Sequence, residues 1–183
     1  MNIALTGASG SIGRLLSPFL KSLGFDVIFI SSSMPGNKEN IFSYADLRNN
    51  NIPLEVDYVI HLASHNSNLE DKKIHEEVKL TDDILNAMAN ICCNKIIFFS
   101  TGKVYGDNSN TQNTFDENSN LNPACSYSKA KKLCEEKIIN KSKEEDFFSI
   151  ILRLPPALIN SESSNLGKLI SIAKKEYPIF SLF

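Results

Sequence analysis

The first thirty residues constrain the fold more than any other stretch of the chain. A short apolar run, Ile3–Leu5, precedes the glycine-rich sequence Thr6–Gly13, which opens a stretch with helical periodicity. A second apolar run, Val27–Ile30, follows. This order of strand, glycine turn, helix and strand is typical of a βαβ unit, so the two strands are expected to be parallel.

The helix between these strands carries apolar residues at positions i, i+3, i+4 and i+7, which predicts burial along one stripe. Gly24 stands where a C-terminal glycine belongs, and Pro18 should kink the second turn because it removes one hydrogen bond. The residues of the predicted buried stripe are Ile12, Leu15, Leu16, Phe19, Leu20 and Leu23.

The glycine turn has the chemistry of a phosphate site. Glycines let the backbone approach a pyrophosphate, and the helix that follows offers free N–H groups and a partial positive charge. The position of the turn, after a strand and before a helix, is the context that this motif requires. The alternative is a tight turn without a ligand. The predicted cofactor contacts in this turn are Gly7, Ser9, Gly10, Ser11, Ile12 and Gly13.

The end of the second strand leaves the choice between NAD and NADP open. A dinucleotide site often has an acidic residue here, which binds the ribose 2′-hydroxyl. This chain instead has Ser31, Ser32 and Ser33, with Lys38 nearby. Hydroxyls and a cation would tolerate a 2′-phosphate, but the same serines could equally form a solvated loop.

The rest of the chain continues the alternation of strands and helices. Six strands predict an α/β fold with a doubly wound parallel sheet (a Rossmann fold) in three α/β/α layers, whose ligand binds outside the carboxyl ends of the strands. The remaining expected strands are 41–45 (ending at Asp46 and Leu47), 57–64, 95–100 and 147–154, and helices are expected over 74–91 and from Tyr127. At the carboxyl ends stand the glycine turn, Asp46, Ala63, Thr101 and Pro155.

Tyr127 and Lys131 lie four residues apart, about one helical turn, and therefore on one helix face. An ammonium held close to a phenol lowers its pKa, so the pair is a candidate general base and its activator. Taken alone the spacing is weak evidence, because most such pairs are ordinary helix residues. In the helix that follows, Leu133, Ile138 and Ile139 are expected to supply apolar contacts.

Composition excludes several classes of protein. The 183 residues are 42% apolar and 22% charged with a net charge of −2, so neither nucleic acid nor a membrane is an expected partner. The N-terminus lacks the basic region of a signal peptide. No zinc spacing joins the four cysteines, no metal site is expected, and His61 is predicted to be a packed strand residue. A reducing cytoplasmic location is the expectation.

Together these motifs resemble the extended short-chain dehydrogenase/reductase family, in particular its nucleotide-sugar epimerases, dehydratases and reductases. The matching pieces follow the family's order along nearly the whole chain. They are Thr6-Gly7-x-x-Gly10-x-x-Gly13, Asp46-Leu47, His61-Leu62-Ala63, Ser100-Thr101-x-x-Val104-Tyr105-Gly106, Asp116-Glu117, Leu121-Asn122-Pro123, Tyr127-x-x-x-Lys131, Glu135 and Arg153.

The resemblance implies a role for three catalytic residues. Thr101 would hydrogen-bond the reacting sugar hydroxyl, Tyr127 would remove or return its proton, and Lys131 would also hold the nicotinamide ribose. Hydride would move between a sugar carbon and the nicotinamide of NAD or NADP. Outside the glycine turn, the expected cofactor contacts are Ser31, Asp46 (at the adenine), Leu47, Leu62, Ala63, Ser64, Tyr127, Lys131 and Pro155.

The chain departs from the family pattern at three places. Glu77 stands where the family often has an active-site asparagine, and this change is expected to loosen the site. Gly102 and Lys103 stand where the family's dehydratases commonly carry a glutamate, which counts against a dehydratase. The third departure concerns the substrate domain into which family members continue. Residues 1–160 are expected to form the NAD(P)-binding domain, and residues 161–183 only the start of that substrate domain.

An epimerase or a reductase acting on a nucleotide sugar is therefore predicted, and the alternative is a catalytically silent NAD(P)-binding module. The chain by itself is expected to bind cofactor but turn over slowly. An uncovered apolar face, around the apolar residues between Leu166 and Phe183, would favour self-association, including a homodimer.

Overall fold

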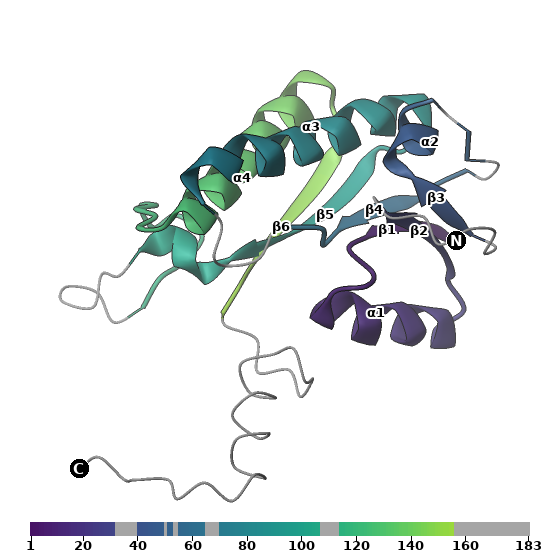
Figure 1. The fold of residues 1–183 in the computed structure, drawn as a ribbon, viewed down its shortest axis with the longest axis horizontal. Helices are drawn as coiled ribbons and strands as arrows, with labels where there is room; N and C mark the ends of the chain where they lie inside the picture. Colours follow the sequence, from purple (N-terminus) through teal and green to yellow (C-terminus); the bar gives the residue numbers. More distant parts are fainter. Residues whose placement is uncertain (32–39, 50, 53–54, 65–69, 107–113, 156–183) are drawn as a thin grey trace, which may run out of the picture.

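The computed structural model describes residues 1–31, 40–49, 51–52, 55–64, 70–106 and 114–155, and it shows an α/β fold (Figure 1). The strands are β1 (Asn2–Thr6), β2 (Asp26–Ser31), β3 (Ile41–Ser43), β4 (Tyr58–His61), β5 (Lys95–Thr101) and β6 (Phe148–Leu154). The helices are α1 (Ser11–Ser22), α2 (Tyr44–Arg48), α3 (Ile74–Asn90) and α4 (Ser126–Glu144), with 3₁₀ turns η1 (Asp71–Lys73) and η2 (Gly102–Tyr105).

All six strands pair in parallel in the order β3-β2-β1-β4-β5-β6, which confirms the predicted doubly wound sheet. The chain builds outward in one direction from β1 and then in the other direction from β4. The strand order therefore reverses between β1 and β4, where Thr6 pairs with His61. Such a switch point is where open α/β sheets bind their ligands.

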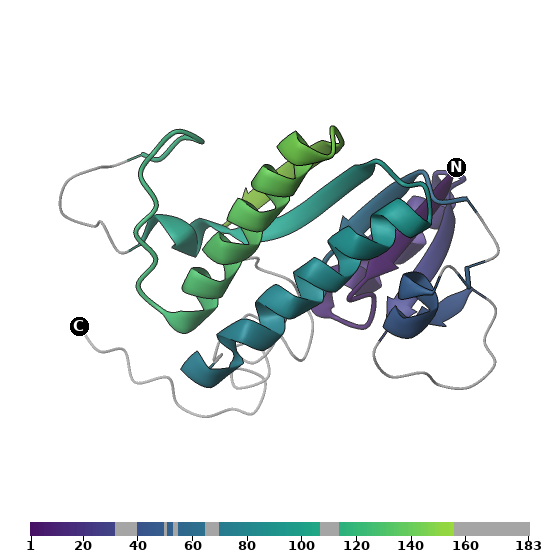
Figure 2. The ribbon, with the colours of Figure 1, turned by 90° about the horizontal axis from the view of Figure 1, so that it is seen from above.

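The helices form separate layers on the two faces of the sheet. Helix α1 covers one face and α3 and α4 cover the other, as Figure 1 shows, and α3 and α4 run side by side in the second view (Figure 2). The larger apolar core lies under α3 and α4 and includes Ile84, Leu85, Met88, Ile96 and Phe98. A smaller cluster includes Leu5 and Leu20 under α1. The three predicted layers are thus confirmed.

Two details of the predicted apolar contacts are wrong. In α1 the buried face runs through Gly13, Ser17 and Leu20, whereas Leu15, Phe19 and Leu23 are 58–59% exposed. A helix with two neighbouring apolar stripes can bury only one of them against a single layer, and the small residues Gly13 and Ser17 allow the closer approach. Likewise Leu133 on α4 is exposed, whereas Ile138 is fully buried.

The third strand is shorter than predicted and ends at Ser43, where α2 begins. Ser43 and Asp46 form a capping box: the Asp46 amide donates to Ser43 Oγ at 3.0 Å, and the Ser43 amide donates to Asp46 Oδ2 at 2.8 Å. These two bonds satisfy amides that a helix start leaves unpaired, so helix replaces strand from Tyr44 onward. The side-chain hydrogen bond from Ser43 also lowers the pKa of Asp46.

Several predictions concern residues outside the described ranges. They are the serines at positions 32 and 33, Lys38, and everything after Pro155, including the expected apolar face between Leu166 and Phe183. Within the described ranges, no helix has the length and apolar character needed to cross a bilayer.

Candidate functional site

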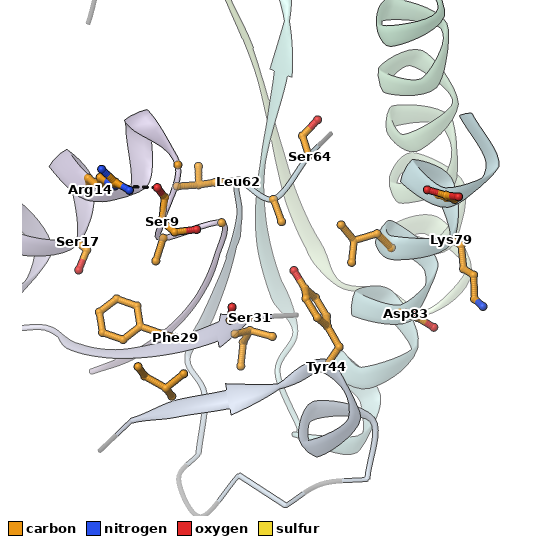
Figure 3. A pocket seen from close by; sticks show the side chains of 18 of the residues that line it. Ser9, Arg14, Ser17, Phe29, Ser31, Tyr44, Leu62, Ser64, Lys79 and Asp83 are labelled. Carbon is orange, nitrogen blue, oxygen red and sulfur yellow. Dashed lines mark hydrogen bonds between the residues drawn. The ribbon is translucent and has the colours of Figure 1, made fainter. Parts of the chain in front are cut away.

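A cavity of about 1000 Å³ opens at the switch point of the sheet (Figure 3). Its walls come from the glycine turn and α1, the end of β2, α2, the residues after β4, and α3. A space of this size is at the upper end of the range for small-molecule sites. Of the predicted cofactor residues, those that line it are Gly7, Ser9, Gly10, Ser31, Leu62, Ala63 and Ser64.

Two of the three glycines in the turn are required by the protein's own packing. Gly7 has a φ of +70°, and a Cβ there would lie 2.6 Å from the Ala63 nitrogen. A Cβ on Gly13 would lie 2.4 Å from the Gly7 carbonyl oxygen. A side chain at either position would therefore push β1, β4 and α1 apart, because nothing that close is tolerated between unbonded atoms.

Gly10 is different, because it lines the cavity and is not tightly enclosed. Its backbone has φ −72° and ψ 169°, which suit any residue, and a Cβ would meet only the Gly7 carbonyl oxygen, at 3.2 Å. Gly10 is also the N-cap of α1, and without a side chain it leaves the first-turn amides to other acceptors. The turn therefore has the cradle and the helix N-terminus that a pyrophosphate group requires.

A buried hydrogen-bond chain fixes the ends of β1 and β4 beside this turn. Thr6 Oγ1 accepts from the Ala63 amide at 3.0 Å and lies 2.8 Å from His61 Nδ1, and His61 Nε2 lies 3.3 Å from Thr81 Oγ1 on α3. His61 is 1% exposed, and burial, with the nearby charge of Lys131, lowers its pKa to about 3. His61 is thus a neutral packed strand residue, as predicted.

This arrangement predicts a loss of stability in mild acid. Because the pKa of His61 is lower in the folded chain than in the unfolded chain, only the unfolded chain gains a proton as the pH falls below about 6.5. At pH 5 we expect this one group to cost about 2 kcal/mol of unfolding free energy. The measurement is urea unfolding at pH 7 and pH 5.

Variants identify the group responsible for that loss. His61→Gln, which keeps one acceptor and one donor, should remove the pH-dependent part of the loss, and His75→Gln on the exposed side of α3 should keep it. Equal acid sensitivity in His61→Gln and the unmodified chain would show that His61 is not the group responsible.

Several residues in the cavity wall were not predicted as contacts, and those with a charged or phenolic side chain include Arg14, Tyr44, Lys79 and Asp83. Tyr44 extends from α2 toward the residues after β4, and burial raises its pKa to about 12, so it stays a phenol (Figure 3). Arg14 donates from Nε to the Ser9 carbonyl oxygen at 2.8 Å. A signal for Arg14 was available, since it directly follows Gly13. The α3 residues could not be placed without knowing how that helix lies on the sheet.

Other predicted cofactor residues do not line the cavity. Asp46 is engaged in the capping box of α2, and Leu47 is 1% exposed within the core. Pro155 is exposed directly after β6. Ser11, Ile12 and Gly13 form the first turn of α1, where backbone amides and not side chains would face a phosphate. The roles predicted for all these residues stay predictions.

Tyr127 lies in the first turn of α4, near Ser64 in the cavity wall. Ser64, which lines the cavity wall after β4, is close enough to the Tyr127 hydroxyl to affect its pKa. Burial raises the pKa of Tyr127, the negative charge of Glu77 raises it further, and the hydrogen bond with Ser64 opposes both effects. The two predicted groups, Ser64 and Tyr127, are therefore brought together although they are far apart in the sequence.

Lys131 is one helical turn further along α4 and is almost completely buried. Its Nζ lies 3.2 Å from Glu77 Oε1 on α3, and the two side chains are 1% and 2% exposed. The ammonium also lies 4.6 Å from the ring centre of Phe98 and 5.9 Å from that of Tyr127. Glu77 is thus the buried ion-pair partner of Lys131, and the expectation that it loosens the site stays a prediction.

Thr101, the third predicted catalytic residue, is the last residue of β5. Its Oγ1 accepts from the Lys103 amide at 3.3 Å and so begins the turn η2, which packs against α4. Thr101 thus stands at the carboxyl edge, as predicted. The described residues contain no cluster of three or more His, Cys, Asp or Glu side chains that could hold a metal ion.

Comparisons with known proteins agree with this geometry. Residues 3–168 match the sequence pattern of the NAD dependent epimerase/dehydratase family. A putative UDP-glucose 4-epimerase of Methanocaldococcus jannaschii is 30% identical over 152 residues, which cover 74% of this chain and 49% of that protein.

Solved structures share the fold. The crystal structure of UDP-N-acetylglucosamine 4-epimerase from Bacillus cereus superposes with a TM-score of 0.73 at 25% identity, over 84% of this chain and 55% of that one. UDP-glucuronic acid 4-epimerase from Bacillus cereus, solved with NAD, gives a TM-score of 0.76 at 22% identity, over 97% and 64% of the two chains. The chain thus spans about half the length of the curated relative that it matches.

Proposed function

Because the chain belongs to the NAD dependent epimerase/dehydratase family, we propose that it is the cofactor-binding part of an epimerase or reductase that acts on a nucleotide sugar. One observation carries the proposal. The cavity at the switch point is bounded on one side by the open glycine turn and on the other by Ser64, whose side chain lowers the pKa of the predicted catalytic Tyr127.

The glycine turn fits the dinucleotide. Gly10 leaves room where a side chain would stand, and the first turn of α1 would donate to the pyrophosphate. The choice between NAD and NADP stays open: Arg14 and Lys79 line the wall and would accept a 2′-phosphate, whereas Glu76 and Asp83 would oppose it.

The residues around Tyr127 fit proton transfer at a sugar hydroxyl, coupled to hydride transfer at the carbon that carries it. The bound nicotinamide would accept or donate hydride at its C4 atom. Thr101 would hold the reacting hydroxyl or carbonyl group, and Tyr127 would exchange a proton with that oxygen through its Oη. Ser64 would orient the phenol by donating a hydrogen bond to its oxygen, and Lys131 would supply positive charge from one helical turn away.

A substitution in the turn tests the cofactor site. Gly10→Val is expected to weaken the binding of NADH or NADPH at least about tenfold, because its branched side chain would occupy the space of the pyrophosphate. The backbone angles of Gly10 suit valine, so the fold should survive. Fluorescence titration with each reduced cofactor measures the loss.

A matched variant separates a blocked site from a broken fold. Gly13→Ala would place a Cβ 2.4 Å from the Gly7 carbonyl oxygen, so it should lower the unfolding temperature as well as binding. Equal affinity in Gly10→Val and the unmodified chain would remove the turn from the cofactor site.

The reaction itself is tested with a panel of UDP-sugars and their 4-keto forms. Epimerase activity is read from the sugar product by NMR, and reductase activity from the absorbance of NAD(P)H. Cofactor binding with no conversion of any sugar, either by the chain alone or by the chain fused to the remaining half of a relative, would favour a silent NAD(P)-binding module instead.

A further inference from the structure

We propose that Arg14 selects NADP(H) over NAD(H), because its guanidinium group would bind the 2′-phosphate that only NADP(H) carries on its adenosine ribose. This inference rests on the proposed function, because it assumes that the cavity at the switch point holds a nicotinamide dinucleotide. It goes beyond that function by naming the form of the cofactor and the residue that distinguishes it.

The position of Arg14 carries the first step. Arg14 lies in the first turn of α1, directly after Gly13, and lines the cavity. Its Nε donates to the Ser9 carbonyl oxygen at 2.8 Å, which holds the guanidinium group against the glycine turn (Figure 3). Arg14 has no carboxylate partner among the described residues, so within that part of the chain its charge is not neutralised.

The end of β2 lacks the acidic residue that an NAD site often has. When a pyrophosphate lies on the first turn of the helix, the 2′-oxygen of the adenosine ribose lies near the end of the second strand. An acidic residue there binds the 2′-hydroxyl of NAD, whereas a nearby arginine accommodates the 2′-phosphate of NADP. Here β2 ends at Ser31, which lines the cavity, and the sequence from 31 to 37 contains no acidic residue. The charged side chain available to the 2′-oxygen from α1 is therefore the cation Arg14.

The other charges in the cavity wall balance one another. Glu76, Lys79 and Asp83 lie on α3, and Asp83 forms an ion pair with Arg48 on α2 at 2.9 Å. These four side chains together have no net charge, so Asp83 does not oppose a phosphate as an unpaired carboxylate would. Arg14, on the opposite side of the cavity (Figure 3), adds a positive charge that a 2′-phosphate, with about 1.5 to 2 negative charges, would compensate.

The chemistry of arginine suits this role. A guanidinium group presents its N–H donors in a planar fork that matches two phosphate oxygens, and it stays charged at physiological pH. Hydrogen bonds between charged groups are stronger than those to a neutral hydroxyl. NADPH should therefore bind at least about tenfold more tightly than NADH.

The test is a fluorescence titration of the chain with NADPH and, separately, with NADH. Arg14→Gln, which removes the charge, should abolish most of the preference for NADPH. Arg14→Lys, which keeps the charge but not the fork, should retain part of it. The ³¹P resonance of the 2′-phosphate should shift when NADPH binds to the unmodified chain and shift less with Arg14→Gln. A residue that only held the turn in shape would affect both cofactors equally, and that result overturns the proposal.

Two other lysines provide controls. Lys21→Gln removes a positive charge from the last turn of the same helix, outside the cavity wall, and should keep the preference for NADPH. Lys79→Gln tests the opposite wall. Loss of the preference in Lys79→Gln, with the preference intact in Arg14→Gln, would place the 2′-phosphate at α3 and overturn the proposal.

A gain of charge decides the question if Arg14→Gln does not fold, which circular dichroism shows. Ser31→Asp places a carboxylate at the end of β2 and should reduce the preference for NADPH at least about tenfold, because like charges would then meet. An unchanged preference overturns the proposal. Equal affinity of the unmodified chain for NADH and NADPH also overturns it but keeps the proposed cofactor site, whereas binding of neither cofactor overturns the proposed function as well.

Discussion

Tyr127→Phe is expected to lower hydride transfer at least about 100-fold, the usual contribution of a positioned general acid or base. The substitution removes one oxygen atom, the phenol oxygen that would exchange the proton. Since the ring stays in place, cofactor affinity should change little. The rate is measured by mass spectrometry as the transfer of deuterium between cofactor C4 and the sugar.

The assay uses the chain alone and the chain fused to the C-terminal half of the Bacillus cereus UDP-N-acetylglucosamine 4-epimerase. Tyr58→Phe serves as the control. Tyr58 is the first residue of β4 and therefore lies at the amino ends of the strands, whereas the cavity opens at their carboxyl ends. An undiminished rate in Tyr127→Phe, alongside a normal Tyr58→Phe, would mean that another group exchanges the proton.

The second large effect concerns stability. Glu135→Gln should lower the unfolding free energy by about 3 kcal/mol, because it leaves the Arg153 guanidinium without its buried counter-charge. Glu135 is fully buried and accepts from Arg153 Nη2 at 2.9 Å and from its Nε at 3.1 Å. Ser100 also donates to this carboxylate. The measurement is urea unfolding at neutral pH.

This network also holds the segment that follows η2. Arg153 Nη1 donates to Tyr105 Oη at 3.0 Å and to the Glu117 carbonyl oxygen at 3.2 Å, and Tyr105 donates to the Asp116 carbonyl oxygen at 2.9 Å. Loss of Glu135 should therefore raise amide exchange between residues 114 and 119 as well. These contacts join β6 and α4 to the turn after β5, where Thr101 stands.

The control lies on the next residue of the same helix. Glu136 pairs with Lys132 at 3.8 Å on the surface, and Glu136→Gln should cost no more than about 0.5 kcal/mol. If the two variants lose the same small amount of stability, the buried network does not contribute what we assign to it.

Much of the fold could be predicted from local patterns. The strand at residues 3–5, the glycine turn and the periodic helix that follows constrain one another, because a parallel sheet requires each crossover to bring the chain back to the same edge. The strand end at Thr101 followed from the same rule, whereas β4 ends at His61, three residues before the end of the predicted strand 57–64. A local signal for α2 was also present, since Ser43 and Asp46 have capping-box spacing, but the apolar Ile41 and Phe42 suggested a longer strand.

The partners of the buried charges could not be predicted in this way. Glu77 and Lys131 are 54 positions apart on different helices, and their contact depends on how α3 and α4 pack. Periodicity also could not decide which apolar stripe of α1 faces the sheet, since Leu15, Phe19 and Leu23 repeat as regularly as the residues that are buried. Both features depend on how helices pack, which a single helix sequence does not specify.

The most direct test of the proposed cofactor site is an NMR titration of the ¹⁵N-labelled chain with NADH and NADPH. We predict saturable binding of at least one of them, with the largest amide shifts at Gly7–Gly13, Ser31 and Leu62–Ser64. Saturable binding with its shifts elsewhere, or no binding of either cofactor, would contradict the assignment of the cavity at the switch point.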